Sequence, residues 1–131
     1  MFLRNSWYVA AWDRELANDP RRQPLARMIL GEPIVFYRQE NGTPVALEDR
    51  CCHRHLPLSL GRLEGDTLRC GYHGLRFDGR GRCVEIPGQV QIPPDAAIRS
   101  YPLVERFGWI WIWMGDPKRA DPALIPNWWW M

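Results

Sequence analysis

The sequence predicts an all-β protein built as an antiparallel sandwich or barrel, and three observations support this fold class. Short runs of β-forming residues recur along the whole chain. Turn signals containing Gly, Asn or Asp separate these runs. Twelve prolines, spaced every few residues, exclude long helices. A chain of 131 residues fits one domain of ordinary size, which can bury a core without disulfide bonds.

The first half of the chain contains four expected strands. Asn41-Gly42, which separates the last two of them, is a strong signal for a two-residue hairpin. A single helical turn is expected over residues 13–17. The four strands cover residues 7–11, 25–30, 33–38 and 44–49.

In the second half, a turn at Asp78-Gly79 follows a short strand over 75–77, and GRCVEIPG (81–88) has the pattern of a further strand. Cys83 in that segment is expected to be a small packed core residue. The run 98–105 then leads through Arg106-Phe107-Gly108 into the last strand.

That last strand is WIWIWM (109–114), in which Trp and Ile alternate. Both of its faces are apolar, so we expect a central strand that is covered on both sides. We interpret the Trp stripe as a buried strand face. Beyond it, Asp121 is expected to cap a turn that begins at Pro122 and stops at Pro126.

Composition excludes several classes of protein. The chain is 46% hydrophobic with a net charge of +2, which excludes intrinsic disorder. No apolar run reaches the roughly 20 residues that cross a membrane, and the N-terminus lacks a signal-peptide core, so a cytoplasmic location is expected. Nucleic acid is not an expected partner, because fifteen acidic residues lie among the basic ones. Six arginines fall between residues 54 and 82, as a solvated face or as a positive rim that docks an acidic protein.

The residue pattern with the clearest chemistry is a pair of Cys-plus-His loops. Cys51 and His53 share a face if their loop is extended, because alternate residues point the same way. Sixteen residues separate His53 from Cys70, and a tight turn allowed by two glycines then brings Cys70 and His73 together.

Three kinds of site could use these residues. A disulfide is disfavoured, because Cys51 and Cys52 are adjacent and the chain has a cytoplasmic character. Two Cys and two His could also hold a tetrahedral zinc ion, although the gap of one residue in the first pair is short for zinc. The third kind is a [2Fe-2S] cluster with two Cys on one iron and two His on the other, which suits two separate loops.

The spacing Cys51-x-His53 and Cys70-x-x-His73 resembles the Rieske pattern in both gap and ligand order. HLPLSLGRLEGDTLRCGYHGLRFD (55–78), GRCVEIPG and FLRNSWYVAAW (2–12) resemble the N-terminal domain of Rieske non-haem iron oxygenases, particularly the vanillate O-demethylase oxygenase branch. The resemblance implies that Cys51 and Cys70 bind one iron, and that His53 and His73 bind the other through Nδ1. Cys52 stands where many members have Pro and is not at a ligand position.

The resemblance also implies an organisation and a redox range. The expected fold is a Rieske-type antiparallel β-sandwich or barrel over residues 1–118, with a cluster-binding subdomain of two loops at about 46–87. Residues 119–131 would begin a linker to a catalytic domain, and the unusual WWWM ending fits a chain cut before it. Leu75 and Phe77 stand where high-potential members carry hydroxyl groups, so a low-potential cluster is expected.

The function that the resemblance implies is electron transfer within an oxygenase that hydroxylates or O-demethylates aromatic compounds. Electrons would come from an NAD(P)H-dependent reductase or a ferredoxin. The full-length protein would form a homo-oligomer, and no membrane is expected as a partner. The chain itself holds no catalytic residue. A mononuclear iron needs two His and one carboxylate, and only His55 remains once the cluster is built. A stand-alone Rieske ferredoxin and a zinc-stabilised binding module are the alternative interpretations.

Overall fold

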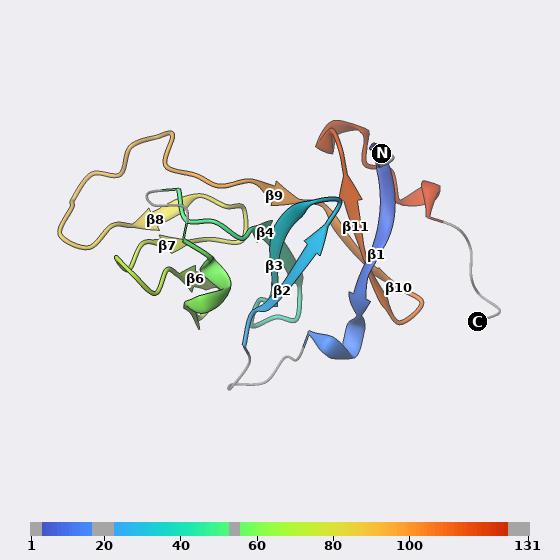
Figure 1. Cartoon of the computed structure of the whole chain (residues 1–131), viewed down its shortest axis with the longest axis horizontal. Coiled ribbons are helices and arrows are strands. Elements are labelled where there is room, and N and C mark those ends of the chain that lie inside the picture. The colour runs from blue at the N-terminus through green and yellow to red at the C-terminus, as the bar shows by residue number, and fades with distance from the viewer. Residues whose placement is uncertain (1–3, 17–22, 53–55, 126–131) are drawn as a thin grey trace.

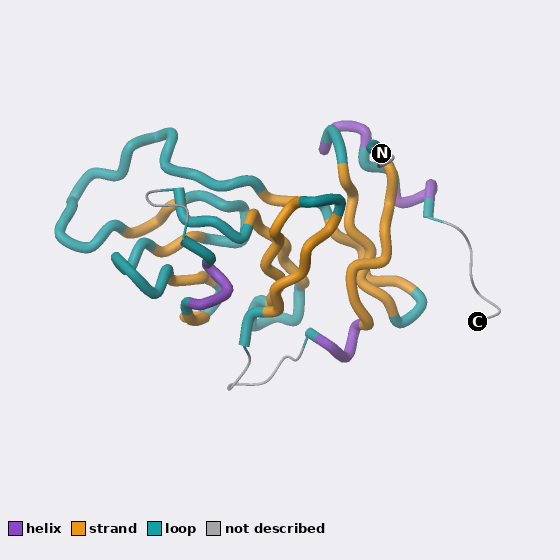
Figure 2. Tube along the Cα trace, in the orientation of Figure 1, coloured by secondary structure: helices purple, strands orange, loops and turns teal. Residues whose placement is uncertain are grey.

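The computed structural model describes residues 4–16, 23–52 and 56–125. It contains three antiparallel sheets that lie one after another along the long axis of the molecule (Figure 1). All regular elements in this part of the chain are strands or short 3-10 turns, which confirms the all-β prediction (Figure 2). No helix among the described residues is long and apolar enough to cross a bilayer.

The sheets are called A, B and C. Sheet A has the order β1 (Ser6–Trp12), β11 (Trp109–Met114), β10 (Leu103–Arg106). Sheet B has the order β2 (Leu25–Ile29), β3 (Glu32–Arg38), β4 (Pro44–Glu48), β9 (Ser100–Tyr101). Sheet C has the order β5 (Arg62–Glu64), β6 (Thr67–Arg69), β7 (Arg76–Phe77), β8 (Cys83–Glu85). The 3-10 turns are η1 (Asp13–Glu15), η2 (Leu58–Leu60), η3 (Pro117–Arg119) and η4 (Pro122–Leu124).

Sheet B is the middle layer, and the alternation along β3 explains why. Ile34 and Phe36 belong to the buried cluster that also contains residues of sheet A. Val35 and Tyr37 belong to the second buried cluster, which contains residues of sheet C. Successive side chains point to opposite faces, so a strand between two cores is apolar at nearly every position.

The expectation of a central strand at 109–114 is confirmed. β11 lies between β1 and β10, and Ile110 and Ile112 pack in the core between sheets A and B. On its other face, Trp113 is buried, stacks edge-on against Trp7 and donates to the carbonyl of Asp116 at 2.8 Å. Trp7 donates in turn to the carbonyl of Asp121 at 2.9 Å, so the segment that follows β11 lies against the Trp face.

The hairpin loops differ in part from the prediction. The β3–β4 hairpin forms at Asn41-Gly42 but is longer than two residues, because Gln39 N–H bonds to the carbonyl of Thr43 and the loop spans residues 40–42. Gly42 supplies the left-handed conformation at the last position of this three-residue loop, with φ of 90°. Two-residue loops occur instead at Leu30-Gly31, Gly65-Asp66 and Phe107-Gly108, and in the first and last of them both central residues have positive φ.

The run 98–105 divides into two strands in different sheets. β9 pairs with β4 in sheet B, and β10 pairs with β11 in sheet A. Pro102 stands between them and has no N–H to donate to a ladder, so the chain changes sheet at this residue. Near the end of the described residues, the Asp121 side chain accepts from Ala123 N–H at 3.0 Å and caps η4, as predicted, whereas Pro126 lies outside them.

Candidate metal centre

Two loops at the edge of sheet C carry the predicted ligands, and the same hydrogen bond closes each of them. The first loop covers residues 49–61 and the second loop covers residues 70–75. Cys51 N–H donates to the carbonyl of Leu56 at 2.8 Å. Cys70 N–H donates to the carbonyl of Leu75, also five residues on, at 2.7 Å. In both loops, therefore, a cysteine N–H donates to the carbonyl group five residues later.

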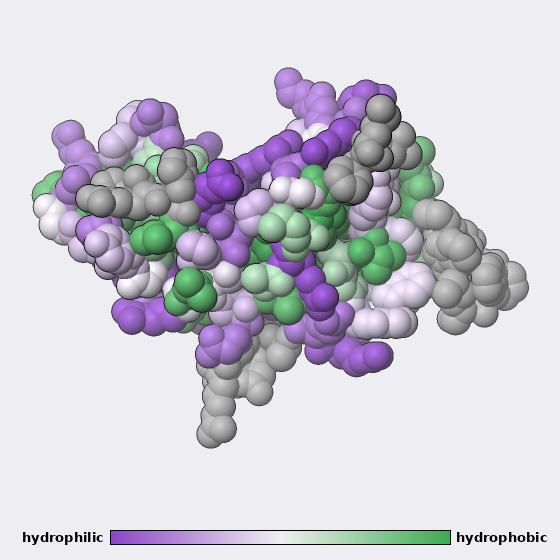
Figure 3. Space-filling model, viewed as in Figure 1, coloured by the Kyte–Doolittle hydropathy of each residue, from purple (hydrophilic) through white to green (hydrophobic). Residues whose placement is uncertain are grey.

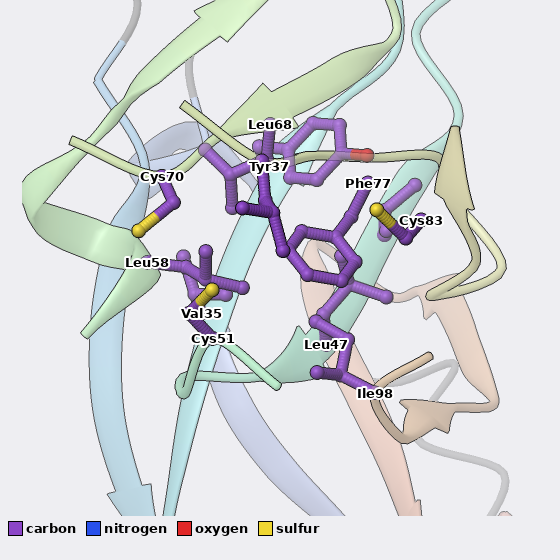
Figure 4. Close-up of a cluster of buried hydrophobic side chains, with 12 residues drawn as sticks. Val35, Tyr37, Leu47, Cys51, Leu58, Leu68, Cys70, Phe77, Cys83 and Ile98 are labelled. Atoms are coloured by element: carbon purple, nitrogen blue, oxygen red, sulfur yellow. The ribbon is translucent and has the colours of Figure 1, made fainter. Parts of the chain in front are cut away.

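The two cysteines belong to one buried cluster. Cys51 is 2% exposed and Cys70 is 3% exposed, and both belong to the core cluster that also contains Leu58 and Leu68. Figure 4 shows their sulfur atoms on the same side of that cluster, whereas Cys83 lies on the other side. Two buried sulfur donors from separate loops are a donor set for a soft metal or an iron–sulfur cluster.

A carboxylate that the sequence analysis missed fixes the first loop. Asp49 is buried and accepts from Ser59 N–H at 2.7 Å and from the Ser59 hydroxyl at 2.6 Å. These bonds join the start of the loop to η2, ten residues later, so the segment that carries Cys51 is held at both ends. No short-range pattern marks such a pair, because the two residues meet only after the loop has folded.

The second half of the first loop rests directly on the second loop. Gly61 has an ordinary negative φ, but a Cβ at this position would lie 1.9 Å from the carbonyl oxygen of Arg69. A Cβ on Gly71 would lie 3.2 Å from the carbonyl oxygen of Leu60. The absence of side chains at these two positions therefore allows the two loops to touch through their backbones.

Gly61→Ala is expected to separate the loops and to destabilise the fold by about 3 kcal/mol, since the added methyl group meets a backbone oxygen that cannot rotate away. Urea unfolding of the purified chain measures this loss. Gly88→Ala is the control, because an added Cβ at this position meets no atom within 4 Å. Its expected loss of unfolding free energy is only the cost of a left-handed backbone, about 1 to 2 kcal/mol. Equal destabilisation by the two variants would contradict a loop contact that depends on Gly61.

Of the three histidines, only His73 lies within the described residues. His73 is exposed in the second loop, where its ring meets that of Tyr72 edge-on at 4.1 Å between centroids. His53 and His55 lie outside the described residues. Within the described ranges, no group of three or more His, Cys, Asp or Glu side chains is gathered for a metal ion. The structure thus places Cys51 and Cys70 in one core cluster and His73 at the protein surface.

The other two cysteines, Cys52 and Cys83, are not predicted ligands. Burial raises the pKa of both the Cys52 and the Cys83 thiol, and Cys83 contributes further to the shift at Cys52. Cys83 is a buried residue of the same core cluster, which confirms the sequence-based expectation. Cys52 is half-buried and, with His73 and Pro87, lines a cavity of about 470 Å³. No disulfide joins any of the four cysteines, all of which are described residues.

Three arginines near the loops are paired with carboxylates. Arg62 and Arg69 both bind Glu64, and Arg69 and Arg76 both bind Glu85. Hydrogen bonds from Arg69 and Arg62 lower the pKa of Glu64 to about 2, and bonds from Arg69 and Arg76 lower that of Glu85. Of the six arginines between 54 and 82, three are therefore compensated internally. Hydrophilic and apolar residues are intermixed over the face of the molecule that Figure 3 shows.

Comparison with protein-family models gives a match to the Rieske [2Fe-2S] domain over residues 6–102. The iron–sulfur subunit of a toluene-4-sulfonate monooxygenase system from Comamonas testosteroni is 57% identical over 130 residues, which cover 99% of this chain and 37% of that protein. The oxygenase component of a dicamba O-demethylase from Stenotrophomonas maltophilia is 50% identical, and a vanillate O-demethylase oxygenase subunit from a Pseudomonas species is 47% identical.

Solved structures give the same result. The crystal structure of apo dicamba monooxygenase superposes with a TM-score of 0.90 at 50% identity, covering 96% of this chain and 38% of that one. The Pseudomonas putida NdmA variant with caffeine superposes with a TM-score of 0.77 at 36% identity, covering 85% of this chain and 34% of that one. The chain thus spans a little over a third of the length of the relatives that it matches.

Proposed function

The chain belongs to the Rieske [2Fe-2S] domain family, and from this premise we propose that it is the electron-transferring domain of an oxygenase component that acts on aromatic compounds. The observation that carries this proposal is the pair of loops that are closed alike and that each contribute a cysteine to one buried cluster. The relatives named above are components of monooxygenase and demethylase systems, which supports the same class of reaction.

We propose Cys51 and Cys70 as the ligands of one iron, and His53 and His73 as those of the other. The described residues fit this assignment, because the two thiols are buried together and His73 is exposed in the same loop as Cys70. When bound, a [2Fe-2S] cluster accepts and releases one electron at a time. A zinc ion would use the same donors but would not provide this chemistry.

In this proposal, residues around the cysteines exclude water from the cluster, and residues around His73 leave it accessible. Leu58, Leu68 and Phe77 are fully buried around the cysteines, so they exclude water from the thiolate side. His73 and the neighbouring Tyr72 are exposed, so the imidazole side faces solvent or a partner. Electrons would therefore enter and leave through the histidine side.

The proposal extends to the organisation of the full-length protein. We assign residues 1–118 to the Rieske domain, about 46–87 to its cluster-binding subdomain, and 119–131 to the start of a link to a catalytic domain with a mononuclear iron. The greater length of the relatives supports a further domain. An NAD(P)H-dependent reductase or a ferredoxin would supply electrons, and full-length subunits would form a homo-oligomer in the cytoplasm.

A redox titration of the chain after anaerobic incubation with iron and sulfide tests this proposal. We expect the absorption and paramagnetic resonance of a [2Fe-2S] centre and a midpoint near the lower end of the roughly −150 to +300 mV Rieske range. The low value follows from Leu75 and Phe77, two buried side chains that have no hydroxyl group to donate to the cluster. A colourless protein that binds only zinc would overturn the proposed function, and a clearly positive midpoint would overturn the low-potential assignment.

A further inference from the structure

We propose that Arg69 is a positioning residue that shapes the second loop, so that His73 is presented to the metal. This inference rests on the proposed function but concerns a side chain that is not a ligand. It follows from the contacts of one guanidinium group, which reaches from one end of the loop to the other.

Arg69 connects the two ends of the loop. Its backbone ends β6 directly before Cys70, and its Nη1 donates to the carbonyl oxygen of Gly74 at 2.7 Å. Gly74 directly follows His73 and has a φ of 77°, a conformation that side chains rarely adopt. The Arg69 bond therefore fixes the Gly74–Leu75 peptide, which begins one residue after His73. It adds to two backbone bonds across the loop, from Gly74 N–H to the carbonyl of Cys70 at 3.2 Å and from Cys70 N–H to the carbonyl of Leu75 at 2.7 Å.

Two carboxylates hold the guanidinium in this orientation. Nε and Nη2 of Arg69 donate to the two oxygens of Glu64 at 2.7 and 2.9 Å. Nη2 also lies 3.2 Å from Oε1 of Glu85. The Arg69 side chain is only 17% exposed, whereas its two carboxylate partners, at 32% and 40%, are more open to water. A planar fork can serve a carboxylate on one side and a carbonyl on the other, whereas the single ammonium of lysine cannot serve both.

The same network provides matched controls. Arg62 donates to Glu64 at 2.7 Å and Arg76 donates to Glu85 at 3.0 Å. Neither bond reaches the second loop. Replacing either arginine by lysine therefore keeps the positive charge and removes a guanidinium group that binds one of the same two carboxylates, but it leaves the bond to Gly74 in place. A difference between Arg69→Lys and these two variants isolates the contact with the loop.

The experiment compares wild type, Arg69→Lys, Arg62→Lys and Arg76→Lys as full chains. We measure the rate of cluster loss at fixed temperature, the paramagnetic resonance spectrum, and hydrogen exchange at the Gly74 amide. Arg69→Lys is expected to lose its cluster roughly tenfold faster, the lower end of the usual effect of outer-shell residues. It is also expected to show a shifted spectrum and faster exchange at Gly74, while the two control variants behave as wild type.

The outcomes separate this inference from the proposed function. Equal behaviour of Arg69→Lys and wild type, or equal losses in all three variants, would overturn the positioning role. Absence of a [2Fe-2S] spectrum in wild type would overturn the proposed function and with it the presentation of His73 to a cluster. Faster Gly74 exchange confined to Arg69→Lys supports the bond to the loop whether or not a metal is bound.

Discussion

Replacing Cys70 with alanine is expected to give a colourless protein that retains no [2Fe-2S] cluster, and Cys51→Ala is expected to do the same. Each substitution removes one of two thiolates that bind the same iron in our assignment, and the methyl group of alanine has no donor atom to replace the sulfur. Iron and sulfide analysis, together with the visible absorption spectrum, measures the loss. Unfolding of the metal-free proteins in urea shows whether the variants still fold.

The other two cysteines are the controls for this prediction. Cys52→Ser changes the residue next to Cys51, and Cys83→Ala changes a buried residue of the same core cluster. Both variants are expected to keep the cluster and an almost unchanged spectrum. If Cys52→Ser lost the cluster while Cys51→Ala kept it, the assignment of the first ligand would be wrong by one residue.

The strands that are covered on both faces were the most predictable part of the fold. β3 and β11 are apolar at nearly every position, because each lies between two packed surfaces, and both lie where the pattern predicted them. Short strands such as β5 and β6 were not predicted. Each has three residues, too few for a period to be recognised, and they are defined by their pairing with each other.

Long-range pairing and turn geometry were beyond the reach of the sequence. β1 pairs with β11, about a hundred residues later, and nothing local to either strand selects that partner. The Asn41-Gly42 signal marked the correct hairpin but the wrong loop length, because Gly42 alone adopts the left-handed conformation there. Phe107 adopts a positive φ in a two-residue turn that its residue type does not favour.

The candidate site divides in the same way. The spacing of Cys51 and Cys70 with their histidines is a local pattern, so it is visible in the sequence. The groups that hold the loops are not local: Asp49 meets Ser59, and Arg69 meets Glu85 only after sheet C has formed. Such outer contacts carry no fixed spacing, and they can be found only from the folded structure.

The second large effect is expected for His73→Cys, which should keep a [2Fe-2S] cluster but lower its midpoint potential by on the order of 100 mV or more. A thiolate adds negative charge at the iron that an imidazole leaves neutral, so the oxidised state gains stability. Clusters with four cysteine ligands lie near about −400 mV, which sets the direction of the change. His73 is exposed in its loop, so the smaller side chain creates no buried cavity.

A redox titration followed by paramagnetic resonance measures this shift, and Tyr72→Phe is the matched control. Its ring keeps the edge-on contact with His73 at 4.1 Å but loses the hydroxyl group, so it perturbs the same surface without changing a proposed ligand. If His73→Cys and Tyr72→Phe both kept the wild-type spectrum and potential, His73 would not be a ligand. A shift confined to His73→Cys requires that residue 73 bind the iron, because a side chain that only neighbours the cluster would not change the charge of the cluster's ligands.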